Sequence, residues 1–253
     1  MTDADPQAAY IAALIELHRG LPREGPGDEA FSLALLDSLP ALPPHPRIAD
    51  LGCGSGAATL LLARYYSSKV IAVDFAAPLI EELEARAREA GLAHLVVGLC
   101  ADMGRLDWAP ASLDLIWSEG AAYAIGFENA LALWRPFLAD GGIAVVSELS
   151  WFDDAPPAAA REYWQTAYPD MGSEAQNIGR ARRAGYRVLE TRRLPSEAWW
   201  KNYYGPLRER MQEIEPTPAN EAVLRETEEE MAQLERWSEV YGYTFYVLQA
   251  TGR

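Results

Sequence analysis

The stretch Ala49-Asp50-Leu51-Gly52-Cys53-Gly54-Ser55-Gly56 lies where a short apolar run ends and a helical pattern begins. Its three glycines remove every Cβ from one side of the turn, so a ligand can approach the backbone closely. The helix expected at residues 57–66 points its free N–H groups at the same ligand. This arrangement predicts a ligand-binding loop that follows the first strand of an α/β sheet.

On both sides of this loop, short apolar runs alternate with helical patterns. Alternating strands and helices are typical of a doubly wound, mostly parallel sheet, whose buried strands are apolar along their whole length. The strands are expected at residues 47–51, 70–73, 95–99, 113–117 and 143–149, and the helices at 57–66, 78–90 and 128–138.

The flanking segments complete one expected domain over residues 1–253. Two helices are expected at 8–17 and 30–39, and two strands at 186–194 and 241–250. We divide the domain into an N-terminal helical cap (1–45), a cofactor-binding core (46–151) and an acceptor side (152–253) with a helical insertion at 195–240 before the last strand.

Three acidic residues follow or end the first three strands. Asp74 comes 24 residues after Asp50, at a position suited to both ribose hydroxyls, and Asp102 is placed to meet an adenine amino group. Asp50 precedes the first glycine and would repel a pyrophosphate but attract an ammonium or sulfonium group. S-adenosylmethionine meets these demands, because it carries a nucleoside and a cationic sulfur but no phosphate.

Two other functions remain open at this stage. Gly52, Gly54 and Ala57 also fit the dinucleotide fingerprint, which makes an NAD(P)-dependent oxidoreductase the first alternative. Asp50 and the absence of a Tyr-x-x-x-Lys pair disfavour it. The second alternative is a protein that binds S-adenosylmethionine without catalysis.

The composition excludes several other classes of protein. A formal charge of −15 disfavours nucleic acids and anionic membranes as partners. No apolar run is long enough to span a bilayer, and the acidic N-terminus has no export signal. Two cysteines and three scattered histidines predict neither a disulfide framework nor a metal site. We therefore expect a cytoplasmic protein without a metal.

Five segments together resemble the class I S-adenosylmethionine-dependent methyltransferases. They are ADLGCGSG (49–56), VIAVD (70–74), CADM (100–103), LDLIWSEGAAY (113–123) and LADGGIAVVSE (138–148). The likeness is to bacterial enzymes of the ubiquinone/menaquinone-biosynthesis and small-molecule type. It implies a Rossmann-like, seven-stranded sheet whose last strand is antiparallel. It also implies methyl transfer from S-adenosylmethionine to a small-molecule acceptor, which leaves S-adenosylhomocysteine.

The resemblance also implies roles for individual residues. Asp50 and the loop Gly52–Gly56, including Cys53 as a small filler, would hold the methionine moiety. The other positions that would contact or border the cofactor are Arg23 (its carboxylate), Asp74 (its ribose), Phe75 (ribose or adenine), Asp102 and Met103 (adenine), and Ser118 with Glu119 (the floor below the methyl group).

The candidates for acceptor chemistry lie near strand ends and in an aromatic-rich segment. Glu119 is the first candidate for a general base and Glu148 the second, because carboxyl ends of parallel strands face the ligand crevice. Tyr123 would orient the acceptor. Ten aromatic residues lie between positions 151 and 204, and aromatic walls suit a planar or cationic molecule. The expected acceptor contacts among them are Trp151, Trp199, Trp200, Tyr203 and Tyr204.

Overall fold

The computed structural model describes residues 6–252 and contains one mixed sheet. Seven strands follow the order β3-β2-β1-β4-β5-β8-β7, and the two-residue strand β6 pairs with β5. β8 runs antiparallel to both of its neighbours, whereas the other strands are parallel. The seven-stranded sheet with an antiparallel last strand is therefore confirmed. The strands are β1 (Ile48–Leu51), β2 (Val70–Asp74), β3 (Val96–Cys100), β4 (Leu113–Ser118), β5 (Leu138–Trp151), β6 (Gly172–Ser173), β7 (Tyr186–Arg193) and β8 (Tyr241–Ala250).

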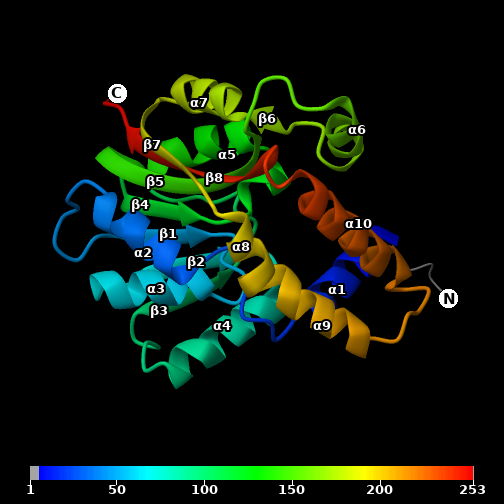
Figure 1. The fold of residues 1–253 in the computed structure, drawn as a ribbon. Coiled ribbons are helices and arrows are strands. Elements are labelled where there is room, and N and C mark those ends of the chain that lie inside the picture. The colour runs from blue at the N-terminus through cyan, green and yellow to red at the C-terminus, as the bar shows by residue number, and fades with distance from the viewer. Residues whose placement is uncertain (1–5, 253) are drawn as a thin grey trace.

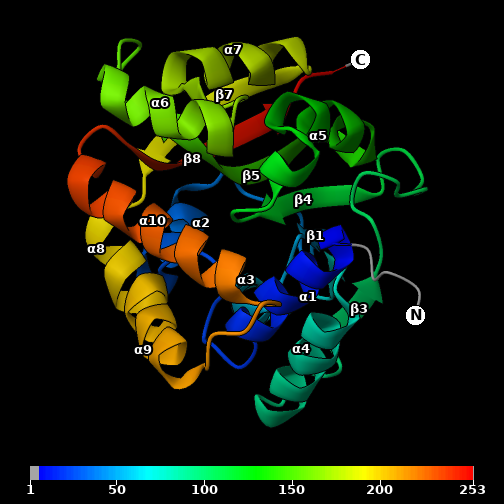
Figure 2. The same ribbon diagram turned by 90° about the vertical axis from the view of Figure 1, so that its right-hand side faces the viewer.

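Helices cover both faces of the sheet (Figure 1). α5 and α7 lie on one face and α2, α3 and α4 on the other, while α1, α9 and α10 form a separate group (Figures 1 and 2). The longer helices are α1 (Pro6–His18), α2 (Glu29–Ser38), α3 (Ala57–Tyr66), α4 (Ala77–Glu89), α5 (Phe127–Trp134), α6 (Ala158–Ala167), α7 (Glu174–Arg183), α9 (Gly205–Glu213) and α10 (Glu221–Trp237). Shorter turns are η1 (Ala122–Ile125), η2 (Arg135–Phe137), α8 (Ser196–Trp199) and the π-helical η3 (Trp200–Tyr204).

The two central strands are apolar because both of their faces are covered. Every residue of β1 and β4 is buried. The acidic exceptions are Asp50 in β1 and Asp114 in β4. Asp114 accepts two hydrogen bonds from the Arg47 guanidinium at 2.8 and 2.9 Å. This pairing lowers the pKa of Asp114 and keeps the carboxylate ionised.

The expected helix end at residue 138 and the expected strand start at residue 143 are both wrong, and Pro136 explains both differences. The helix expected at 128–138 ends at Trp134 and tightens into η2, because Pro136 cannot supply a helical N–H. β5 consequently begins at Leu138 rather than at residue 143. The insertion at 195–240 is helical but interrupted between α9 and α10, where Pro216 and Pro218 stand.

The fold brings the carboxyl ends of β1, β2 and β4 to one edge of the sheet. The loop after β1, the loop after β2 and the turn after β4 meet there. Among the described residues, no helix is both long and apolar enough to cross a membrane.

Candidate functional site

The glycines of the loop between β1 and α3 are required by packing as well as by any ligand. Gly52, Gly54 and Gly56 have φ angles of +75°, +53° and +93°. A Cβ at Gly52 would lie 2.1 Å from the Cβ of Ala121, and one at Gly56 would lie 2.1 Å from Cδ1 of Leu83. Close approach of a ligand, which the sequence predicts, is therefore only one reason for these glycines, and packing against Ala121 and Leu83 is a second.

The N–H groups of this loop already have partners within the chain. The N–H groups of Gly52 and Cys53 donate to the Val73 carbonyl at 2.8 and 3.0 Å. Gly54 N–H donates to Asp74 Oδ2 at 2.9 Å, and Ser55 N–H donates to Glu24 Oε2 at 3.0 Å. The free N–H groups expected from the sequence are those at the start of α3 (Ala57–Tyr66), so that expectation stays a prediction. The N–H groups of Gly54 and Ser55 donate to carboxylates of the chain, which occupy the position that an anionic ligand would take.

Two of the predicted acids are buried beside the loop. Asp50 is 1% exposed and accepts a hydrogen bond from Thr59 Oγ1 at 2.6 Å. Burial raises the pKa of Asp50 to about 7, with smaller contributions from Glu119 and Asp74. Burial also raises the pKa of Asp74, although the N–H groups of Ala76 and Gly54 oppose the shift. The loop therefore lies in a negative field that disfavours a pyrophosphate.

The residues predicted to border adenine lie on the loops after β2 and β3. Phe75 is 64% exposed, which leaves its ring free to cover a ligand. The Asp102 carboxylate accepts from Gly104 N–H at 2.8 Å, and the sulfur of Met103 lies beside Gly52. Ser118, in contrast, is fully buried and donates to the Leu51 carbonyl at 2.7 Å, so its hydroxyl joins the ends of β4 and β1.

Glu119 has three hydrogen-bond donors around its carboxylate. Arg23 donates to Oε2 at 2.8 Å, while Ser32 and the Trp117 indole donate to Oε1 at 3.0 and 2.8 Å. The Arg23–Glu119 ion pair is shielded, with 13% and 9% of the two side chains exposed. Sequence reasoning missed Ser32, because nothing in the sequence spacing links α2 to the turn after β4.

The strap, which we define as residues 21–27 between α1 and α2, lies across the loop. Besides Arg23, it supplies Glu24, which bonds Ser55 N–H and whose Oε1 is buried without a hydrogen-bond partner. Asn202 holds the far end of the strap by donating to the Gly27 carbonyl at 2.9 Å. Arg86 of α4 donates to the Leu21 carbonyl at 2.5 Å. The strap therefore connects α4 to η3.

Glu148 contrasts with Glu119 in its surroundings. It is 2% exposed, and neither of its carboxylate oxygens has a hydrogen-bond partner. Burial raises the pKa of Glu148 to about 8, while the neighbouring Tyr168 hydroxyl and the charge of Arg180 oppose the shift. The Tyr168 hydroxyl is also buried without a well-aligned hydrogen bond, and its ring lies 6.0 Å from that of Tyr123. Sequence reasoning missed Tyr168, which is one aromatic residue among ten.

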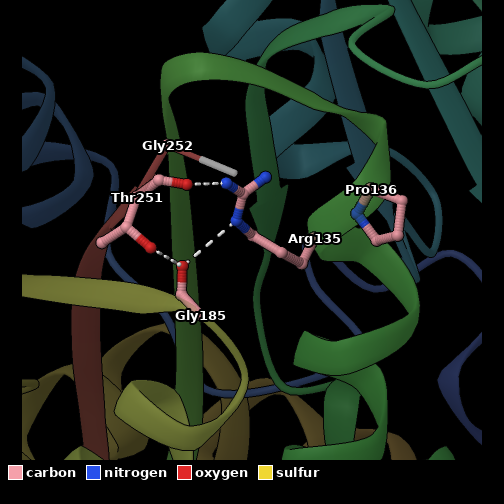
Figure 3. Close-up of a pocket in the computed structure, with 5 residues that line it drawn as sticks. All are labelled: Arg135, Pro136, Gly185, Thr251 and Gly252. Atoms are coloured by element: carbon pink, nitrogen blue, oxygen red, sulfur yellow. Dashed lines mark hydrogen bonds between the residues drawn. The ribbon is translucent and has the colours of Figure 1, made fainter.

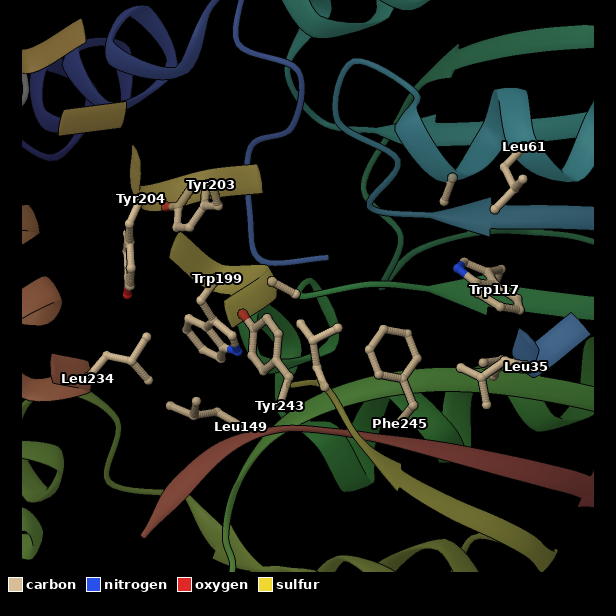
Figure 4. Close-up of a cluster of buried hydrophobic side chains, with 14 of the residues drawn as sticks. Leu35, Leu61, Trp117, Leu149, Trp199, Tyr203, Tyr204, Leu234, Tyr243 and Phe245 are labelled. Atoms are coloured by element: carbon tan, nitrogen blue, oxygen red, sulfur yellow. The ribbon is translucent and has the colours of Figure 1, made fainter. Parts of the chain in front are cut away.

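Most of the aromatic residues expected to contact the acceptor lie in the core (Figure 4). The Trp199 ring packs against Tyr243 at 4.8 Å between centroids, and Tyr203 packs against Tyr204 at 4.9 Å. The Tyr204 hydroxyl donates to Glu230 at 2.5 Å. The exposures are 6% for Trp151, 3% for Trp199, 8% for Tyr203 and 1% for Tyr204, whereas Trp200 is partly exposed beneath Arg208.

A pocket of about 240 Å³ lies at the opposite edge of the sheet (Figure 3). Arg135 crosses it and donates to the Gly185 carbonyl at 3.1 Å, and Thr251 Oγ1 donates to the same carbonyl at 2.8 Å. None of the predicted site residues lines it. Among the described residues, no group of three or more His, Cys, Asp or Glu side chains is arranged to hold a metal ion.

Comparison with known proteins identifies the core of the chain. A family model described as "Methyltransferase domain" matches residues 48–142. A malonyl-[acyl-carrier protein] O-methyltransferase from Methylovorus sp. (strain MP688) is 41% identical over 81 residues, which are 29% of this chain and 26% of that protein. The trans-aconitate 2-methyltransferase of Escherichia coli O1:K1 / APEC is 26% identical over 74% of this chain and 69% of its own length. The match to the first relative thus spans about a quarter of its length.

The solved structures extend the similarity in fold to the whole chain. A methyltransferase from Geobacter sulfurreducens, in complex with S-adenosyl-L-homocysteine, has a TM-score of 0.75 at 20% identity. The alignment covers 98% of this chain and 99% of that one. The domain match thus shows a methyltransferase domain at residues 48–142, and the solved structure shows that the whole chain has the same fold as that methyltransferase.

Proposed function

We propose that this protein transfers the methyl group of S-adenosylmethionine to a small-molecule acceptor. The observation that carries the proposal is the pair of buried carboxylates, Asp50 and Asp74, at a glycine loop whose N–H groups already have partners. A dinucleotide would bring its pyrophosphate into this negative field. A nucleoside that carries a sulfonium and an ammonium group would instead be attracted.

The residues of the loop edge fit such a ligand. In this proposal the segment from Asp50 to Gly56 holds the methionine moiety, Asp74 accepts hydrogen bonds from the ribose hydroxyls, and Ser118 supports the floor from below. Phe75, Asp102 and Met103 frame the adenine. Arg23 turns from Glu119 to the cofactor carboxylate, and the buried Glu24 leaves Ser55 N–H when the cofactor enters.

When bound, S-adenosylmethionine supplies a methyl group on a cationic sulfur that leaves as a neutral thioether. The protein's contribution is to align the acceptor with that methyl group, to exclude water and, where needed, to remove a proton. Alignment alone is worth up to about 7–11 kcal/mol in well-oriented model reactions. Glu148 is the better candidate for the base, because the Glu119 carboxylate is already held by three donors.

The remaining predicted residues have supporting roles in the proposal. Tyr123 is 50% exposed after β4, where its hydroxyl can orient an acceptor. In the proposal, the buried aromatic residues support the wall of the acceptor site from behind and do not contact the acceptor with their ring faces. They are Trp151, Trp199, Tyr203 and Tyr204, with Trp200 nearer the surface.

Calorimetric titration of the protein with S-adenosylmethionine, S-adenosylhomocysteine and NAD tests the cofactor. We expect the first two to bind and NAD not to bind. Asp74→Ala should weaken S-adenosylmethionine binding by at least about tenfold, equivalent to about 1.4 kcal/mol, because two hydrogen bonds from the ribose are lost.

Asp140→Ala is the matched control, since Asp140 lies at the start of β5, at the other end of the sheet. It should leave the affinity unchanged. Equal affinity in the Asp74 variant and the parent, or preferential binding of NAD, would contradict the assignment. Release of S-adenosylhomocysteine in the presence of candidate acceptors then measures turnover.

A further inference from the structure

A buried acid and a buried phenol lie next to each other on the α5–α7 side of the sheet. Along β5 the side chains alternate, so Glu148 shares a face with Val146, which packs in the same cluster as α5. Both oxygens of Glu148 and the hydroxyl of Tyr168 lack a well-aligned hydrogen bond. Leaving a buried polar group unsatisfied costs about 1–3 kcal/mol. Such a cost is typical of a site that a ligand completes.

The charged and titratable groups around Glu148 leave its carboxylate without a counter-ion. The charge of Arg180 in α7 acts on Glu148, but its guanidinium donates to the Asp170 carbonyl at 2.9 Å and to Asn177 Oδ1 at 2.8 Å. No ion pair joins it to Glu148 in the part of the chain that the structure describes. The other groups that interact electrostatically with Glu148 are four phenols, those of Tyr123 in η1, Tyr168 after α6, and Tyr243 and Tyr246 in β8.

The rings around this acid are suited to a cation. Tyr123 and Tyr168 meet edge to face at 6.0 Å between centroids, and Tyr123 is half exposed. The faces of phenol rings attract ammonium groups. Tyr168 stands outside the helix, as the residue that follows α6, so a change of its rotamer breaks no helical hydrogen bond. A turn of the Tyr168 side chain would therefore leave the backbone of α6 intact.

We propose that Glu148, Tyr168 and Tyr123 bind the amine group of the methyl acceptor, so that the acceptor is a small molecule with a basic nitrogen rather than a carboxylic acid. The proposal rests on the proposed methyl transfer and names the acceptor class for the same site. Tyr168 is a positioning residue, since it acts by orienting the Glu148 carboxylate toward the amine.

The proposed reaction conserves protons and electrons. A proton of the bound ammonium moves to a Glu148 carboxylate oxygen, and the nitrogen lone pair that it leaves forms the bond to the methyl carbon. The carbon–sulfur bond breaks with its electron pair remaining on sulfur, which turns from sulfonium into thioether. The methylated amine then leaves, and the proton on Glu148 passes to solvent.

Three probes with one scaffold test the acceptor class. Benzylamine, benzyl alcohol and benzoate are titrated into the protein saturated with S-adenosylhomocysteine, and saturation is verified first. We expect benzylamine to bind at least about tenfold more tightly than benzoate. A bound ammonium group lowers the raised pKa of Glu148 and pairs with its ionised form, whereas that form repels the carboxylate of benzoate. Failure to bind S-adenosylhomocysteine would overturn the proposed function itself, whereas a failure confined to the probes would overturn only the acceptor class.

Two variants locate the effect. Glu148→Gln should abolish the preference for benzylamine over benzoate, and Tyr168→Phe should reduce it while leaving cofactor affinity unchanged. Tyr65→Phe and Glu81→Gln are matched controls on α3 and α4, and both should behave as the parent. Tighter binding of benzoate, an undiminished preference in Glu148→Gln, or no binding of any probe at about 10 mM would each overturn the proposal.

Discussion

The two candidate bases show how hydrogen-bond partners decide the chemistry of identical side chains. Glu119 is surrounded by an arginine, a serine hydroxyl and an indole N–H, which occupy lone pairs of its carboxylate. Glu148 has no such donor and is buried. The carboxyl group with an elevated pKa is the one suited to proton transfer near neutral pH.

Glu148 should also make the stability of the protein depend on pH. Its pKa rises from 4.5 to about 8 in the folded chain, so the native state binds a proton more tightly than the unfolded state. The free energy of unfolding should therefore fall as the pH rises through this window, by up to about 1.4 kcal/mol per pH unit from this group. Glu148→Gln removes that dependence.

Urea unfolding of the parent and of Glu148→Gln at several pH values between about 5 and about 8 measures the effect. The variant should gain stability relative to the parent as the pH rises. The exposed substitution Glu81→Gln should show a constant difference. A parallel pH dependence in Glu148→Gln and the parent would show that Glu148 is ionised across this range.

At the scale of elements, the glycine loop is a junction between three parts of the fold. It ends β1, begins α3 and packs against α4 through Gly56 and Leu83. The strap ties the same junction to η3 through Asn202. A change in this loop should therefore alter both helix packing and the proposed cofactor site.

Gly56→Ala should destabilise the protein by about 2–4 kcal/mol. Its φ of +93° is costly for alanine, and the new Cβ would lie 2.1 Å from Cδ1 of Leu83. Gly91→Ala is the matched control, because Gly91 also has a positive φ (+71°) but nothing within 4 Å of its Cβ position. It should cost only about 1–2 kcal/mol.

Chemical denaturation of the two glycine variants separates backbone strain from overpacking. Calorimetric titration with S-adenosylmethionine measures whether the altered loop still binds this ligand. Equal losses of stability in both variants would mean that α4 yields to the added methyl group. In that case the contact between Gly56 and Leu83 would not be a constraint on the loop.

At the scale of the whole molecule, the net charge of −15 opposes the compact state through self-repulsion. The acids of α10 add to it, since most of them are exposed. Surface ion pairs such as Arg64–Glu29 offset little of this, because exposed pairs contribute about 0–1 kcal/mol each.

The melting temperature should therefore rise when NaCl is increased from about 0.01 M to about 0.1 M, which shortens the Debye length from about 30 Å to about 10 Å. Differential scanning calorimetry at fixed pH measures this, and sucrose at equal osmolality controls for solute effects. A melting temperature that falls over this range would mean that ion pairs outweigh the net repulsion.

The sequence by itself determined the part of the fold that surrounds the glycine loop. The strands and helices from residue 48 to Glu89 match their expected positions to within one residue, and Asp50, Asp74 and the glycines meet at one edge. These features are local: hydrophobic period, glycine spacing and strand-end acids act over a few residues and leave a readable pattern.

Only the tertiary structure decided which acids have partners and which aromatic residues are buried. Ser32 reaches Glu119 across 87 positions, and His18 meets Tyr203 across 185. Tyr168 lies near Glu148 only because the C-terminal end of α6 packs close to β5. Such contacts depend on how distant elements pack, and burial then sets the pKa, so no local pattern in the chain records them.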